Sequence, residues 1–75
     1  MYSHLNKSTI RALYSAIEFE HRFKQDFYVM QKNHKKDICT NDIERYRKLG
    51  YKVRYRVHMG GISVYSLTGK MYNAD

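Results

Sequence analysis

The sequence predicts an α+β fold for residues 1–75, with two to three N-terminal helices followed by a C-terminal antiparallel β-hairpin. Between residues 6 and 32 there is no Gly or Pro, and the apolar residues recur at helical spacing. From residue 51 to residue 59, apolar or aromatic residues alternate with cationic ones, which is typical of a strand. A chain of 75 residues with 43% hydrophobic content has room for one small core. We therefore expect a single domain.

Two helical stripes run through the N-terminal half. The first predicts the buried face of a helix and consists of Ile10, Leu13, Tyr14, Ile17 and His21. The second is offset from the first and consists of Phe19, Phe23, Phe27 and Met30. One long helix could carry both stripes, but we expect two helices that meet near residues 23–25. Asn6, Ser8 or Thr9 can cap the first helix, and the polar residues 33–37 form the loop that ends this region.

A further short helix is predicted for residues 41–49. Asn41 is suited to cap it, Asp42 falls in its first turn, and Glu44 follows three residues after the cap. Gly50 is the expected stop signal. An apolar face, formed by Ile43, Tyr46 and Leu49, leaves the basic residues Arg45, Arg47 and Lys48 largely on the other side.

The C-terminal region predicts a β-hairpin that turns at Gly60-Gly61, because both central positions of a type I′ turn require positive φ. With this turn, Val57 pairs with Val64 and Met59 with Ile62. One face is then buried and consists of Val53, Val57, Met59, Ile62 and Val64. The other face is exposed and consists of Lys52, Arg54, Arg56, His58 and Tyr65.

The charge of the chain favours an anionic partner. Fourteen Lys and Arg residues against seven Asp and Glu residues give a net charge of +7, and residues 44–58 hold six cations with one anion. On one strand face, Lys52, Arg54 and Arg56 would stand about 6.6–7 Å apart, close to the spacing of successive phosphates on a nucleic-acid strand. The alternative is a solvated face that protects the ribbon from edge pairing. The candidate binding residues are Arg45, Arg47, Lys48, Lys52, Arg54, Arg56, His58 and Tyr65.

Catalytic and metal-binding motifs are not apparent. Glu18 and Arg22 fit an ordinary surface pair, and no nucleophile elbow or phosphate loop accompanies them, so we expect a protein that is not an enzyme and needs no cofactor. His34 and Cys39 lack the paired spacing of structural zinc sites. The lone cysteine and the absence of a long apolar run lead us to expect a cytoplasmic protein without a membrane partner.

Residues 41–68 resemble the recognition helix and wing of winged helix-turn-helix DNA-binding domains. The resemblance rests on the Leu49-Gly50 step, the Gly60-Gly61 turn and the returning segment from Val64 to Thr68. It implies that Arg45, Arg47 and Lys48 face the major groove or its phosphates. It also places Lys52, Arg54, Arg56 and His58 on the wing.

In overall style the chain resembles the small orphan proteins of tailed bacteriophages, which mostly act by binding in the host cytoplasm. It is short, rich in Tyr, Lys and Asn, and has neither Pro nor Trp. We therefore expect a phage-type regulator that binds nucleic acid or a complex that handles it. The alternative is a protein-targeted inhibitor of a host enzyme or defence system, which docks in an acidic groove.

Overall fold

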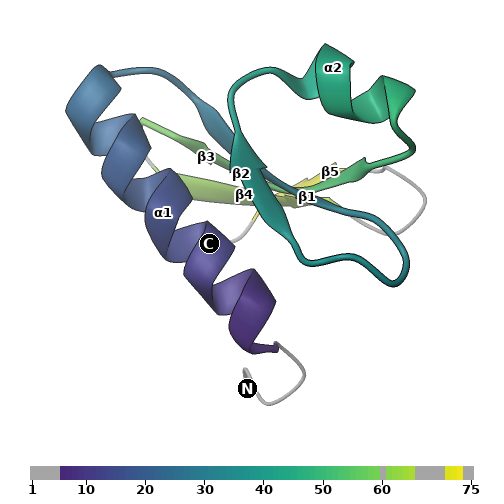
Figure 1. Ribbon diagram of the computed structural model, residues 1–75. Coiled ribbons are helices and arrows are strands. Elements are labelled where there is room, and N and C mark those ends of the chain that lie inside the picture. The colour runs from purple at the N-terminus through teal and green to yellow at the C-terminus, as the bar shows by residue number, and fades with distance from the viewer. Residues whose placement is uncertain (1–5, 60, 66–70, 74–75) are drawn as a thin grey trace.

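The computed structural model describes residues 6–59 and 61–65, and the backbone of residues 71–73. These residues form two helices and one antiparallel sheet of five strands (Figure 1). In chain order the elements are α1 (Lys7–Phe23), β1 (Phe27–Gln31), β2 (Ile38–Thr40), α2 (Ile43–Lys48), β3 (Lys52–His58), β4 (Gly61–Tyr65) and β5 (Met71–Asn73). The predicted α+β class is confirmed. The predicted order of helices followed by a hairpin is wrong, because β1 and β2 form a hairpin of their own between the helices.

Helix α1 begins and ends close to the predicted positions. The side chain of Asn6 caps the helix by accepting a hydrogen bond from the backbone N–H of Thr9 at 2.8 Å. The helix ends at Phe23, after which Lys24 adopts a left-handed conformation and its N–H bonds to the Glu20 carbonyl. The predicted break near residues 23–25 is confirmed, but a strand follows it instead of a second helix.

Phe27 shows why the second stripe was mistaken for a helix. Its ring lies 5.5 Å from that of Phe19 and 6.2 Å from that of Phe23. These contacts join strand β1 to helix α1 across a tertiary interface, although their sequence spacing matches that of a continuous helix. The spacing of these aromatic residues therefore reflects contacts between α1 and β1, not one continuous helix.

The buried face of α1 differs from the predicted one. Thr9, Ala12 and Ala16 are buried, whereas Tyr14 is 70% exposed. Small side chains let the helix lie close to the sheet, and the larger apolar side chains remain on its flank. The main core joins helix and sheet and consists of Ala12, Ala16, Phe27, Val29, Tyr55 and Val57.

The sheet order is β2-β1-β3-β4-β5, with β3 at the centre. Strand β3 pairs with β4, so the C-terminal hairpin is confirmed, but Val57 pairs with Ile62 instead of Val64. A shift of two residues leaves the faces of β3 and β4 matched to each other as predicted, because strand side chains alternate with a period of two. His58 pairs with Gly61, and Met59 is 90% exposed instead of buried. Gly60 and the part of the returning segment after residue 65 lie outside the described residues.

A register irregularity between β1 and β3 turns two buried residues away from α1. Val29 pairs with Tyr55, but the next residue, Met30, pairs with Val53, so Arg54 is an extra residue on β3. Met30 and Val53 are buried, yet they lie outside the core cluster under α1. Helix α2 contacts β1 and β3 from the side of the sheet opposite α1 (Figure 1), and we infer that it covers these two residues.

Helix α2 is shorter than predicted and has a different cap. Its cap is Asp42, one residue after the predicted Asn41, and the Asp42 carboxylate accepts from the N–H of Arg45 at 3.3 Å. Gly50 follows the helix with a φ of +96°, which confirms its role as the stop. Ile43 and Tyr46 are only half-buried, so α2 is held loosely on the sheet.

Candidate nucleic-acid interface

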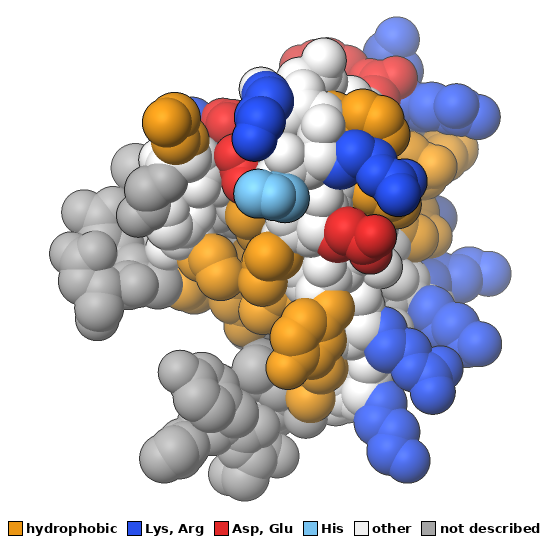
Figure 2. Space-filling view, turned by 90° about the vertical axis from the view of Figure 1, so that its left-hand side faces the viewer, with side chains coloured by type: hydrophobic (Ala, Val, Ile, Leu, Met, Phe, Trp, Pro, Cys, Tyr) orange, Lys and Arg blue, Asp and Glu red, His pale blue; other side chains and the backbone are white. Residues whose placement is uncertain are grey.

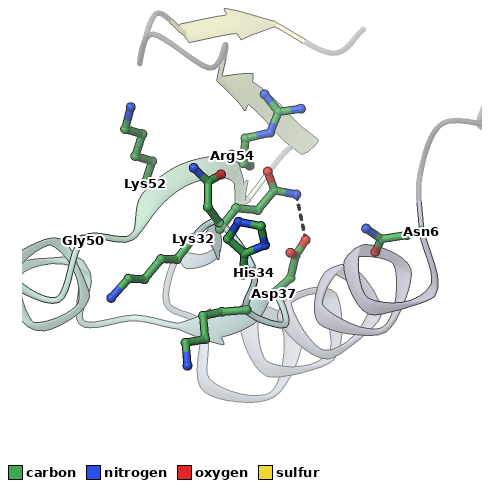
Figure 3. Close-up of a pocket in the computed structure, with 10 residues that line it drawn as sticks. Asn6, Lys32, His34, Asp37, Gly50, Lys52 and Arg54 are labelled. Carbon is green, nitrogen blue, oxygen red and sulfur yellow. Dashed lines mark hydrogen bonds between the residues drawn. The ribbon is translucent and has the colours of Figure 1, made fainter.

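A hollow of about 660 Å³ opens beside the first turn of α1. The residues that line it come from the start of α1, the end of β1, the loop between β1 and β2, and the chain that follows α2 (Figure 3). Cations dominate the lining, and its described members are Asn6, Gln31, Lys32, Asn33, His34, Lys35, Asp37, Gly50, Lys52 and Arg54. We call the cationic members, with His34, the cationic site: Lys32, His34, Lys35, Lys52 and Arg54.

Asp37 is the one carboxylate among the described lining residues, and neutral donors surround it. Its Oδ2 atom accepts from the Thr9 hydroxyl at 2.6 Å and from the Gln31 amide at 2.8 Å. Its backbone N–H donates to the hydroxyl of Ser8 at 2.7 Å. This network ties the start of α1 to the loop before β2. Because its direct partners are neutral, Asp37 forms no ion pair with a lysine or arginine of the site.

Lys32 links the hollow to the end of α2. Its ammonium group donates to the carbonyl of Leu49 at 2.5 Å, where the helix dipole is negative, and lies 5.7 Å from the centre of the Tyr51 ring. Gly50 lies against the same side chain, and a Cβ atom there would approach Lys32 Cε to 3.3 Å. The positive φ of Gly50 and this close approach together bring α2 to the rim of the hollow.

Arg54 and Lys52 enter the site from β3. The Nη1 atom of Arg54 donates to the backbone carbonyl of Tyr65 at 3.0 Å. Its buried Nε atom has no hydrogen-bond partner among the described residues. A buried donor without an acceptor costs free energy. Lys52 is exposed and extends from the same strand (Figure 3).

His34 occupies a tight turn in the loop between β1 and β2. Its φ is +64°, which non-glycine residues adopt at some cost, and the N–H of Lys35 closes the turn on the Lys32 carbonyl at 3.1 Å. The turn carries Lys32, His34 and Lys35 to the hollow together. Their side chains are thus positioned by backbone geometry.

The basic residues of α2 extend this surface beyond the hollow. Arg45, Arg47 and Lys48 are exposed, and Gly50 joins their helix directly to the rim. Arg47 forms only a long ion pair of 3.8 Å with Glu44 on the solvent face. Lys and Arg side chains also gather along one edge of the molecule in Figure 2, beside the hydrophobic side chains of that view.

Besides the basic residues of α2, three further predicted site residues lie outside the hollow. Arg56 forms a two-point ion pair with Asp26 at 2.6 and 2.8 Å, and this hydrogen bond raises the pKa of the guanidinium. His58 bonds to the hydroxyl of Ser63 at 3.0 Å, and Tyr65 contributes only its carbonyl, to Arg54. The expectation that Lys52, Arg54 and Arg56 form one ladder is wrong. The extra residue in β3 breaks the alternation between Arg54 and the residues that precede it.

The sequence interpretation missed Lys32, His34 and Lys35. Their signal was visible as a basic run after the second aromatic stripe, but the run was interpreted only as a polar loop. If residues 27–31 had been assigned to a strand, the basic loop that follows them would have been placed at the end of a β1–β2 hairpin. Its lysines would then have been expected near β3, the strand that follows α2.

Comparisons with protein-family models, curated proteins and solved structures find no significant match to this chain. Residues 41–65 do contain a short helix followed by a hairpin, as the resemblance to winged helix-turn-helix domains implies. A strand, β2, immediately precedes α2 where that motif has a helix. The assignment to that family and the phage origin stay predictions.

Two further features bear on the kind of site. Among the described residues, no group of three or more His, Cys, Asp and Glu side chains is arranged to hold a metal ion. In the same residues, neither helix has the length and hydrophobicity needed to cross a membrane. Cys39 is half-buried on β2 and packs against the main core.

Proposed function

We propose that the protein is a non-enzymatic binding protein that holds the sugar-phosphate backbone of nucleic acid in the cationic site. The observation that carries this proposal is the convergence of five basic side chains on one hollow whose described carboxylate is bonded to neutral donors. Lysine and arginine at such density favour phosphate oxygens, which accept several hydrogen bonds at once.

An extended polyanion fits this surface better than a single small anion. The cations of α2 continue from the rim of the hollow at Gly50, so a strand seated at Lys52 can also contact Arg47 or Lys48. The nearby aromatic rings of Tyr46 and Tyr51 pack edge to face against each other at 5.5 Å and are engaged within the fold. We therefore propose backbone binding with little reading of base sequence.

The salt dependence of binding tests this proposal. With three to four phosphates neutralised, affinity for a labelled duplex should fall with a log–log slope of about −3, at roughly −0.9 per phosphate. Fluorescence anisotropy of the purified protein with duplex and with single strand, at several salt concentrations, measures this slope. No binding at low salt would overturn the proposal.

Two adjacent lysines provide a matched pair of variants. Lys35 lines the hollow and Lys36 does not, although both are exposed loop residues with the same charge. Lys35→Glu should weaken binding to DNA clearly more than Lys36→Glu. Equal losses would show that only the overall charge matters. An acidic protein partner, the earlier alternative, would bind without nucleic acid and with a gentler dependence on salt.

A further inference from the structure

Helix α1 has a second apolar face that the fold leaves exposed. Ile10 is 37% exposed, Tyr14 70% and Ile17 40%, although their neighbours Ala12 and Ala16 are buried. Hydrophobic side chains are visible at the surface on the left-hand side of Figure 1, which faces the viewer in Figure 2. An amphipathic helix in a small domain ordinarily turns its large apolar residues toward the core. Here Ala12 and Ala16 face the core with Leu13 and Phe19 packed beside them, and a second set of large apolar residues faces outward.

The spacing of the exposed face is that of a coiled-coil seam. Ile10, Tyr14, Ile17 and His21 follow one another at intervals of four, three and four residues. This interval pattern repeats every seven residues and places side chains on a narrow stripe that suits a facing helix. We call these four residues the outer stripe.

The outer stripe lies on the side of α1 that is turned away from β2. On a helical wheel it is roughly opposite Ser8, at 100° per residue, and the Ser8 hydroxyl bonds to the backbone of Asp37 beside β2. Helix α1 packs on β1, β2 and β3. A five-stranded sheet is about 20 Å wide and a helix about 10 Å, so one helix leaves part of the face for a second.

The charged residues beside the outer stripe of one copy are complementary to those of a second copy. Arg11 flanks its N-terminal half and Glu18 its C-terminal half, and neither forms an ion pair with another described residue. In a parallel pair, the flank that carries Arg11 and Glu18 would face the opposite flank of the partner helix, so these two charges would not meet. In an antiparallel pair, Tyr14 of one helix meets Ile17 of the other, and Arg11 comes close to Glu18 at both ends.

We propose that two copies of the chain form an antiparallel dimer through the outer stripe of α1. The two copies are related by a twofold axis, so the same patch of each copy contacts the other. Each stripe covers its partner, and no further copy can add to the assembly through this surface. A helix of 17 residues is only about 25 Å long. The dimer is therefore small and dissociates on dilution. It does not depend on nucleic acid or on the cationic site.

Sedimentation equilibrium without nucleic acid tests the dimer. The apparent mass should rise with concentration from 9.1 kDa toward twice that value. Tyr14→Glu, at an exposed position, should raise the dissociation constant by about tenfold or more and leave the circular dichroism spectrum unchanged. A monomer at every concentration, or a dimer that Tyr14→Glu does not weaken, would overturn the proposal.

A charge swap tests the antiparallel arrangement. Arg11→Glu and Glu18→Arg should each weaken the dimer, because each change brings like charges together across the seam. The double variant restores the complementary pairs and should recover most of the affinity. Lys36→Glu, with the same charge change away from α1, serves as the control. Failure of the double variant to recover affinity would overturn the antiparallel pairing.

Discussion

Cys39 on β2 is half-buried between α1 and the sheet, and its surroundings are apolar. Burial disfavours the charged thiolate and raises the pKa of the thiol from 9.0 to about 11. A thiol that stays protonated near neutral pH is a poor nucleophile and a poor metal ligand. Cys39 therefore acts as a small packing residue.

The reactivity of Cys39 should depend on folding. At pH 8 the folded protein should react with Ellman's reagent about 100-fold more slowly than the urea-unfolded chain, because two pKa units separate the thiols. The unfolded thiol ionises first as pH rises, so the contribution of Cys39 to stability is present below pH 9 and is lost between about 9 and 11. Cys39→Ala should remove this component of the pH dependence. Equal reaction rates in both states would contradict the prediction.

Strand β3 directs apolar side chains to both faces of the sheet because it contains an extra residue. Tyr55 and Val57 pack under α1, whereas Val53 turns with Met30 toward the side of α2. The bulge thus divides the apolar residues between a main core and a smaller cluster. It also explains how a short helix with no fully buried residue stays attached to the sheet.

Met30 should therefore be essential to stability although it lies outside the main core. It is fully buried, so Met30→Ala should cost about 2–5 kcal/mol of unfolding free energy through lost contacts and a cavity. Met30→Leu nearly conserves volume and should cost less than about 1.5 kcal/mol. Met59→Ala, at a position 90% exposed, should change stability by no more than about 0.5 kcal/mol. Urea denaturation of the three variants measures these differences, and equal effects at residues 30 and 59 would contradict this assignment.

Across the whole molecule, the basic residues fall into separate groups with different roles. Lys52 and Arg54 line the hollow, whereas Arg56 is neutralised locally by Asp26. Lys32 both lines the hollow and donates to the end of α2. The net charge of +7 therefore overstates the number of cations that are free to meet one ligand.

Neutralising single cations should separate binding from stability. Lys52→Gln should lower the magnitude of the salt slope for DNA by about 0.9 and leave the thermal midpoint almost unchanged. Arg56→Gln should do the reverse, with a loss of stability of about 0.5–1 kcal/mol and little change in binding, because its ion pair with Asp26 is lost. Anisotropy and thermal denaturation on the same samples provide both readouts. A loss of binding with Arg56→Gln and none with Lys52→Gln would contradict this division of roles.

Local features of the fold were predicted well from the residues alone. The cap at Asn6, which was one of three candidates, the break after Phe23, the stop at Gly50 and the existence of the C-terminal hairpin all follow from short-range chemistry. Each depends on side chains or backbone preferences within a few positions of the feature itself. The predicted candidate residues Lys52 and Arg54 also lie in the site, since the strand that carries them was correctly assigned.

The sequence by itself determined the ends of α1, the approximate positions of α2 and β3, and the strong positive charge. Tertiary structure alone decided which face of α1 is buried. Ala12 and Ala16 are on that face because their small side chains let the helix pack close to the sheet. It also decided that Phe27 belongs to a strand, that Val57 pairs with Ile62, and that Arg54 is an extra residue in β3, which breaks the alternation between Lys52 and Arg56. These outcomes depend on contacts between residues distant in the chain, whose energies a local pattern does not contain.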